Sequence, residues 1–277
     1  MDRILKGTVR FSLFLCLLVT TSAQAGRYIV PSNDQVLETY TVSDSHKLNP
    51  HSIEVLVWNI YKTDKSDFYS EWERFATGKD LVLIQEAWES SHFLDSLSDI
   101  GTSEAIMARS WIDGKRENTA TGVMTLSRTH SANARWVRSP GREPFVKTPK
   151  MTLISFYNLE GLDEQLMVLN LHALNFTSLS SFKKTLNQLK ARIKNHPGPV
   201  LFGGDFNTHL NSRFSFMQSY FKELNFKQVR FTPDNRYRIL GRYLDFTFVR
   251  GLKVLTAQAV KTTGSDHHPM LLKLSLF

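Results

Sequence analysis

Short apolar runs recur along the chain from residue 53 onward, and many are bounded by glycine, proline or polar clusters. Runs of about four to eight residues with such boundaries are typical of β-strands. The pattern predicts strands over Ile53–Ile60, Leu81–Gln85, Gly122–Leu126, Leu153–Tyr157, Gln165–Leu171, Val200–Phe202, Leu244–Val249 and Met270–Leu276.

Three stretches between these runs place apolar residues near helical spacing. They are Phe68–Ala76, Ser181–Lys194 and Phe214–Leu224. Many strands with a few helices, and without a regular strand–helix–strand alternation, indicate a mixed α/β sandwich.

The region before the first run is polar, and its apolar residues show no helical or strand-like periodicity. Residues 26–51 are therefore interpreted as an N-terminal lead-in. No internal repeat or low-complexity linker follows it. Residues 52–277 are therefore predicted to form one domain.

The first 25 residues have the pattern of a secretory signal peptide. A basic start precedes the apolar block Phe11–Thr20, which is too short to span a bilayer easily. Small residues follow at Ala23 and Ala25, so we expect cleavage after Ala25 and export to the periplasm or the medium. The alternative is an uncleaved membrane anchor.

Charge and cysteine content narrow the chemistry. The formal net charge is +8, and cleavage after Ala25 would leave 31 basic and 25 acidic residues, a net +6. Such a surplus favours polyanions such as nucleic acid or anionic lipid head groups. Cys16 is the only cysteine, so the mature chain would lack disulfides, thiolate catalysis and cysteine metal sites. Oxygen and imidazole ligands remain, and they suit Mg²⁺, Mn²⁺ or Ca²⁺.

Polar side chains gather where the apolar runs end. Taken singly, each has a structural explanation, since acids and amides commonly end strands and form turns. Together they would make a site for a hard cation with acid–base partners beside it. The residues are Asn59, Glu86, Asn170, His172, Asn175, Asp205, Asn207, Asp245, Asp266 and His267.

The stretch VLFGGDFNTHL, residues 200–210, shows how two of them can act together. Asp205 and Asn207 are alternate residues of a strand end, so their side chains can share one face. Gly203 and Gly204 have no Cβ atom and allow neighbouring backbone to approach closely.

The motifs WNI, QE, NLHALN, GDFN, LDF and SDHHP follow one another between Trp58 and Pro269. In this order they resemble the endonuclease/exonuclease/phosphatase family, which includes deoxyribonucleases, abasic-site endonucleases, neutral sphingomyelinases and inositol-polyphosphate 5-phosphatases. The amino-acid sequence around these motifs is most similar to that of an uncharacterised bacterial subgroup. The resemblance implies a four-layer α/β sandwich, with two mixed sheets face to face and helices outside. Its site would lie at one end of the sheets.

The resemblance also implies roles for the polar residues. Glu86 would be the principal ligand of Mg²⁺ (or Mn²⁺), assisted by Asn59, and Asp266 would reach the metal shell. Asp205 would orient or deprotonate the attacking water, and Asn207 would hold phosphoryl oxygens. His267 would be the distal catalytic imidazole, and Asp245 would fix its tautomer. His172 would contact the phosphate or donate a proton, and Asn175 would place an amide at the phosphate.

Three functions are compatible with these residues. We expect an exported metal-dependent nuclease, because of the net charge and because the basic run Lys227–Arg242 leads straight into the LDF motif. That run would equally suit a solvated loop. The alternatives are a phosphodiesterase or phosphatase acting on lipid head groups, as sphingomyelinases do, and a non-catalytic binding module. The complete set of polar residues argues against the binding module.

Overall fold

The computed structural model describes residues 27–43 and 47–277. The signal peptide predicted for residues 1–25 lies outside these residues. Within the described part of the chain, none of the helices has the length and apolar character needed to cross a membrane.

The larger of two sheets has eight strands in the order β1-β5-β6-β4-β3-β16-β15, with β2 paired to β5. Only β3 and β4 run parallel; the other pairs are antiparallel. The strands are β1 (Tyr28–Ile29), β2 (Leu37–Thr41), β3 (Ile53–Asn59), β4 (Leu81–Trp88), β5 (Glu104–Asp113), β6 (Thr119–Ser127), β15 (Lys253–Ala259) and β16 (Met270–Ser275).

The second sheet has six strands in the order β11-β14-β10-β9-β8-β7, and only β9 and β10 run parallel. Its strands are β7 (Asn133–Arg138), β8 (Met151–Asn158), β9 (Gln165–His172), β10 (Val200–Asp205), β11 (Lys227–Gln228) and β14 (Asp245–Arg250). A separate hairpin joins β12 (Arg238–Ile239) to β13 (Arg242–Tyr243).

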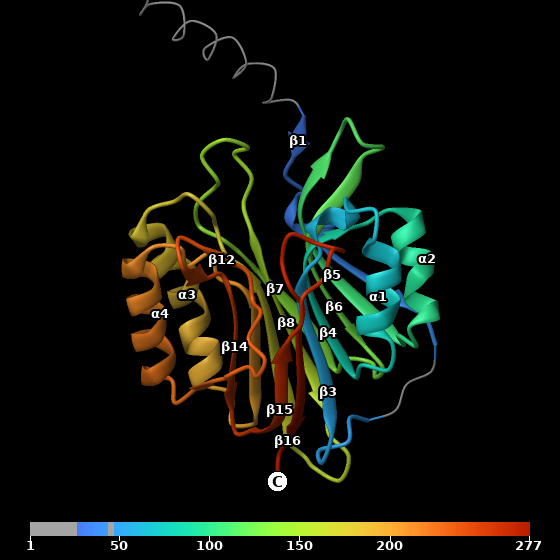
Figure 1. Cartoon of the computed structure of the whole chain (residues 1–277), viewed down its shortest axis with the longest axis vertical. Helices are drawn as coiled ribbons and strands as arrows, with labels where there is room; N and C mark the ends of the chain where they lie inside the picture. Colours follow the sequence, from blue (N-terminus) through green and yellow to red (C-terminus); the bar gives the residue numbers. More distant parts are fainter. Residues whose placement is uncertain (1–26, 44–46) are drawn as a thin grey trace, which may run out of the picture.

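Four helices cover the outer faces of the two sheets (Figure 1). Helices α1 (Phe68–Ala76) and α2 (Ser91–Asp99) pack on the larger sheet, and α3 (Leu179–Lys194) and α4 (Asn211–Glu223) pack on the smaller one. Two short 3₁₀ turns lie at Asn33–Gln35 and Tyr61–Thr63. The predicted four-layer α/β sandwich is confirmed.

The central strands are apolar at most positions because both of their faces are buried. In β3, Val55 and Val57 point into the core between the sheets, whereas Leu56 and Trp58 point outward beneath α1. Strands covered on both sides read as continuous apolar runs rather than alternating ones. This packing explains why the run pattern located the inner strands.

Each predicted strand and helix is present in the described residues, with ends moved by a few positions. The sequence pattern missed α2 and the strands β5, β7 and β15. The strands β7 and β15 lie at sheet edges and carry mixed polar residues, so they form no apolar run. The lead-in contributes β1 and β2, which pair with β5.

Candidate active site

Strand register places three predicted site residues side by side. Asp205, the last residue of β10, pairs with His172 of the parallel strand β9 and with Asp245 of the antiparallel strand β14. Neighbours across a ladder present their side chains on one face of the sheet. The three strands therefore bring these side chains to a single row.

The glycines before Asp205 permit this close arrangement. A Cβ atom on Gly204, where φ is +143°, would lie 2.0 Å from the carbonyl oxygen of Leu171 in β9. A Cβ atom on Gly203 would lie 3.0 Å from Val57 in the opposite sheet. The expected close backbone approach is confirmed, because a side chain at Gly204 would force β9 and β10 apart.

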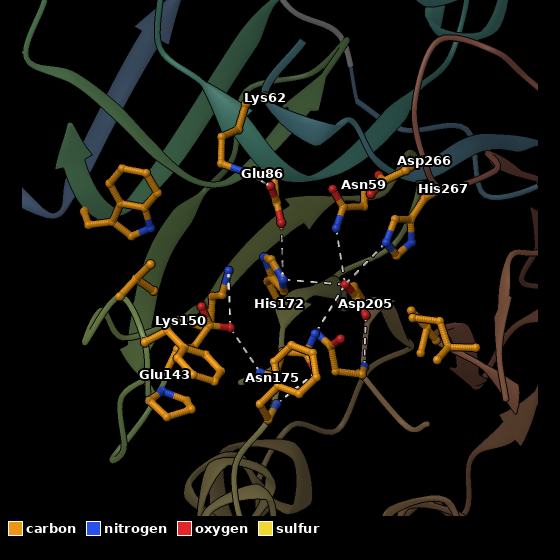
Figure 2. Close-up of a pocket in the computed structure, with 18 of the residues that line it drawn as sticks. Asn59, Lys62, Glu86, Glu143, Lys150, His172, Asn175, Asp205, Asp266 and His267 are labelled. Carbon is orange, nitrogen blue, oxygen red and sulfur yellow. Dashed lines mark hydrogen bonds and ion pairs between the residues drawn. The ribbon is translucent and has the colours of Figure 1, made fainter. Parts of the chain in front are cut away.

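Amide groups surround the buried carboxylate of Asp205 (Figure 2). Its Oδ1 accepts the backbone N–H of Asn207 at 2.9 Å, and its Oδ2 accepts the side-chain amides of Asn59 at 3.2 Å and Asn207 at 3.3 Å. The Asn207 amide also donates to the carbonyl oxygen of Ala173 at 3.0 Å. Both N–H groups of this amide are engaged, so Asn207 orients Asp205, and contact with a phosphoryl oxygen would require one bond to be exchanged.

Burial raises the pKa of Asp205 to about 7, with His267 opposing the shift and Asp245 adding to it. A carboxyl group that titrates near neutral pH is suited to accept a proton in catalysis.

His267 and Asp245 form a buried pair next to Asp205. The Nδ1 atom of His267 lies 2.7 Å from Oδ2 of Asp245, and its Nε2 atom lies 4.0 Å from Oδ2 of Asp205. Burial alone would lower the pKa of His267, but Asp245 and Asp205 raise it to about 10. The imidazole is therefore cationic at neutral pH, and its Nδ1–H is directed at Asp245.

The loop that carries His267 is anchored to β3. The Trp58 indole donates to the carbonyl oxygen of His267 at 3.1 Å, and Ser265 Oγ donates to the carbonyl oxygen of Asn59 at 2.7 Å. The conformation of the SDHHP motif thus depends on the WNI motif of the larger sheet.

A pH titration tests the His267–Asp245 pair. The pKa of His267 is raised above its ordinary 6.5, so its contribution to the free energy of unfolding is fully present below pH 6.5 and is lost as the pH rises through about 10. In Asp245→Asn we expect the His267 ring resonances to titrate at a lower pH and this alkaline loss of stability to shrink. An unchanged His267 titration would show that Asp245 does not hold the proton.

Glu86 enters the site from a β-bulge. The ladder between β4 and β6 is irregular between Gln85 and Ala87, and Glu86 itself has a φ of +52°. Bulges and left-handed residues that redirect a side chain are common next to functional sites. Without the bulge, Glu86 would pair within the ladder.

Two lysines face the Glu86 carboxylate. Lys62 forms an ion pair with this carboxylate, and Lys150 lines the same cavity (Figure 2). Burial would raise the pKa of Glu86, but Lys150, Lys62 and His172 together hold it well below its usual range. Glu86 is therefore ionised, which is the state that a cation ligand requires.

The described residues offer oxygen donors that fit a divalent metal ion. Glu86, Asn59 and Asp266 all line the cavity, and hard oxygen ligands of this kind suit Mg²⁺ or Mn²⁺. Ligand atoms of Asp205, Asp245 and His267 lie within 4.8 Å of one another and form a second possible set. Asp245 Oδ1 in this set is buried without a hydrogen-bond partner.

His172 lies between the two acidic groups. Its Nε2 atom is 3.5 Å from Asp205 and 4.0 Å from Glu86. Burial and the charge of Lys150 lower the pKa of His172 well below its ordinary value. A neutral imidazole can donate a hydrogen bond, which favours the phosphate-contacting role over proton donation.

Asn175 lies at the edge of the same cavity. Its backbone N–H donates to Glu143 at 3.1 Å, and Glu143 lies 3.7 Å from Lys150. Of the ten polar residues predicted at the strand ends, all but Asn170 and Asp245 line this cavity, which has a volume of about 470 Å³. Asp245 contacts the cavity-lining His267.

Lys62 and Lys150 are not among the site residues predicted from the sequence. Lys150 immediately precedes β8, whose antiparallel register with β9 brings it beside the end of β9. That register depends on strand pairing, which residue spacing does not reveal.

Gln85 and Asn170 link the two sheets beneath the cavity. The Gln85 side-chain amide donates to Asn170 Oδ1 at 2.7 Å, and Asn170 donates in turn to the carbonyl oxygens of Ile84 at 3.1 Å and Met124 at 2.9 Å. This buried network holds Glu86, the next residue along β4, and His172, two residues further along β9, at the same end of the molecule.

The basic run Lys227–Arg242 divides between structural and exposed positions. Arg236 is buried, pairs with Asp234 and donates to the carbonyl oxygen of Asp245 at 2.9 Å. Arg238 and Arg242 belong to the β12–β13 hairpin. Ile239 of this hairpin and the preceding residue, Tyr237, line the cavity. Part of the run therefore borders the site.

Comparison with known proteins agrees with this arrangement. A model of the endonuclease/exonuclease/phosphatase family matches residues 56–267. The chain belongs to this family. Its members are phosphoester hydrolases.

A UPF0294 protein of Vibrio parahaemolyticus is 35% identical over 231 residues, which cover 81% of this chain and 78% of that protein. This relative fits the uncharacterised bacterial subgroup expected from the sequence.

Solved structures share the fold at lower sequence identity. An endonuclease/exonuclease/phosphatase from Beutenbergia cavernae is 18% identical with a TM-score of 0.67, over 82% of this chain and 72% of that chain. The human Nocturnin catalytic domain is 16% identical with a TM-score of 0.59, over 86% and 97% of the two chains.

Proposed function

We propose that this chain is an exported, Mg²⁺-dependent hydrolase that cleaves a phosphodiester with an activated water. The observation that supports it best is a carboxyl group with a pKa near 7, Asp205, beside an imidazole that Asp245 keeps cationic. Export rests on the signal-peptide pattern of residues 1–25.

In this proposal Asp205 accepts the proton of the attacking water as the new P–O bond forms. The ester P–O bond breaks, and its oxygen leaves as an alcohol after taking a proton from solvent. Asn59 and Asn207 orient the carboxylate through the hydrogen bonds described above. The His267 cation and the neutral His172 lie on either side and offset negative charge at the phosphoryl oxygens. A cation held by Glu86, with Asn59 and Asp266, would supply Lewis acidity at those oxygens.

A nuclease remains a second candidate because of the net positive charge. Much of this charge lies away from the cavity, however. Helix α3 alone carries Lys183, Lys184, Lys190, Arg192 and Lys194, and it covers the outer face of the smaller sheet (Figure 1). Charge on that face does not favour nucleic acid at the site.

A substrate panel with Mg²⁺ tests the proposal. We expect hydrolysis of the soluble diester bis(p-nitrophenyl) phosphate, and we expect EDTA to abolish it. Plasmid DNA, single-stranded DNA, RNA, sphingomyelin vesicles and phosphoinositide vesicles would be assayed in parallel, with Asp205→Ala as the inactive control. Absence of metal-dependent hydrolysis on the whole panel would refute the proposed reaction, whereas cleavage of nucleic acid alone would select the nuclease.

A further inference from the structure

Exposed apolar side chains gather around the opening of the active-site cavity. Among the described residues, the three most exposed large hydrophobic side chains are Leu240 at 84%, Phe145 at 76% and Phe176 at 67%. Phe145 and Phe176 line the cavity, as do the exposed residues Tyr237 and Ile239 next to Leu240. We call Phe145, Phe176, Tyr237, Ile239 and Leu240 the apolar rim.

The turn that presents Leu240 does not require a leucine. Leu240 and Gly241 form the two-residue loop between β12 and β13, with φ of +51° and +77°. Hairpin loops with two positive φ values favour Asn-Gly, and a leucine there is strained. Leu240 gains nothing from packing in return, because most of its surface is exposed. Its presence is explained if a binding partner covers it.

A second segment also presents an exposed apolar side chain, Phe145, at the cavity opening. The loop over residues 139–150 is closed by backbone hydrogen bonds from Glu143 to Thr148 and from Ser139 to Lys150, at 2.9 and 2.8 Å. The Phe145 ring lies in an edge-to-face arrangement with Phe176, at 6.3 Å between centroids, and 76% of Phe145 is exposed. Phe176 has a φ of +49°, another conformation that is unusual for a bulky residue.

Basic side chains flank the apolar rim on both segments. Arg238 and Arg242 belong to the hairpin of Leu240, and Arg142 and Lys147 belong to the loop of Phe145. Apolar side chains among arginine and lysine residues are the composition of surfaces that lie in the interface of an anionic membrane.

We propose that the apolar rim inserts into the surface of an anionic lipid bilayer and holds the active-site cavity over a lipid head group. The inference rests on the proposed phosphodiester hydrolysis and names its substrate class as a lipid-borne phosphodiester. Leu240 and Ile239 enter the acyl boundary, and the flanking arginines contact lipid phosphates. Aliphatic side chains do not stack on bases, so a single-stranded nucleic acid would leave both uncovered.

Vesicle sedimentation tests the rim with the protein purified in the form that the expressing cell produces. The vesicles contain equimolar phosphatidylcholine and phosphatidylglycerol, with EDTA present to prevent turnover. We expect Phe145→Ser/Leu240→Ser to partition at least about tenfold more weakly than the wild type. The matched control is Leu255→Ser/Phe277→Ser, which removes two exposed apolar residues away from the cavity and is expected to bind like the wild type. Phe277 ends the chain opposite the hairpin (Figure 1).

A single variant separates binding from folding. Leu240→Asn suits the positive φ of the turn, so we expect its thermal midpoint to rise while its vesicle partition falls. Equal partition of the wild type and both rim variants would overturn the proposal, as would rim variants that lose affinity for a single-stranded oligonucleotide but not for vesicles. The outcome is independent of the proposed reaction, which is measured separately on the soluble diester.

Discussion

Asparagine in place of Asp205 is expected to lower kcat on a soluble phosphodiester by about a thousandfold or more, with KM little changed. Asparagine has nearly the shape of aspartate, but it cannot accept a proton from water. The Asn207 backbone N–H can still donate to an amide oxygen in the Oδ1 position, whereas the side-chain amides of Asn59 and Asn207 lose their acceptor at Oδ2. A stability measurement is therefore needed to separate the missing base from a disturbed site.

Thermal unfolding provides the control for this variant. Burial raises the pKa of Asp205, so the ionised carboxylate costs stability above that pKa, and we expect chelator-treated Asp205→Asn to unfold at a higher temperature than the wild type at pH 8. Asp80→Asn is the matched control, because burial also raises the pKa of Asp80, at the opposite end of β4 from Glu86. It should keep the wild-type kcat. A near-wild-type kcat in Asp205→Asn would assign the base to another group.

The inner strands and most of the site could be predicted because both depend on local pattern. Strands buried on two faces are apolar at most positions, so β3, β4, β9 and β10 stand out in the sequence. Polar residues at the ends of such strands have few structural alternatives once they recur in five of the eight predicted runs. This is why Glu86, His172 and Asp205 were singled out before their contacts were known.

The parts that could not be predicted depend on pairing across long separations. Lys150 lowers the pKa of Glu86 because the pairing of β8 with β9 brings it to the same cavity. Lys62 pairs with Glu86 because the chain turns sharply at Tyr61–Thr63 with positive φ values. The apolar rim also cannot be recognised from the sequence. Leu240 and Phe145 read as ordinary apolar residues, and only their exposure distinguishes them from core.

Two substitutions, one at the predicted metal ligand Glu86 and one at its ion-pair partner Lys62, are expected to change Mg²⁺ affinity in opposite directions. Glu86→Gln removes the ionised carboxylate but keeps its shape, so we expect Mg²⁺ to bind at least about tenfold more weakly and kcat to fall with it. Lys62→Met removes an ammonium group that pairs with the same carboxylate. A cation would then meet less repulsion, so Mg²⁺ should bind more tightly than in the wild type. Calorimetric titration of the chelator-treated proteins measures both affinities without turnover.

The opposite directions of these two changes in Mg²⁺ affinity distinguish a Glu86 that binds the metal from a Glu86 that only supports the structure. If Glu86 only held Lys62 in place, both substitutions would disturb the same ion pair and would alter Mg²⁺ affinity in the same direction. Equal affinity in all three proteins would instead move the cation to the neighbouring set of Asp205, Asp245 and His267, whose ligand atoms lie within 4.8 Å of one another. In that case Asp205→Asn, rather than Glu86→Gln, would abolish Mg²⁺ binding, because Asp205 would then be a ligand as well as the proposed base.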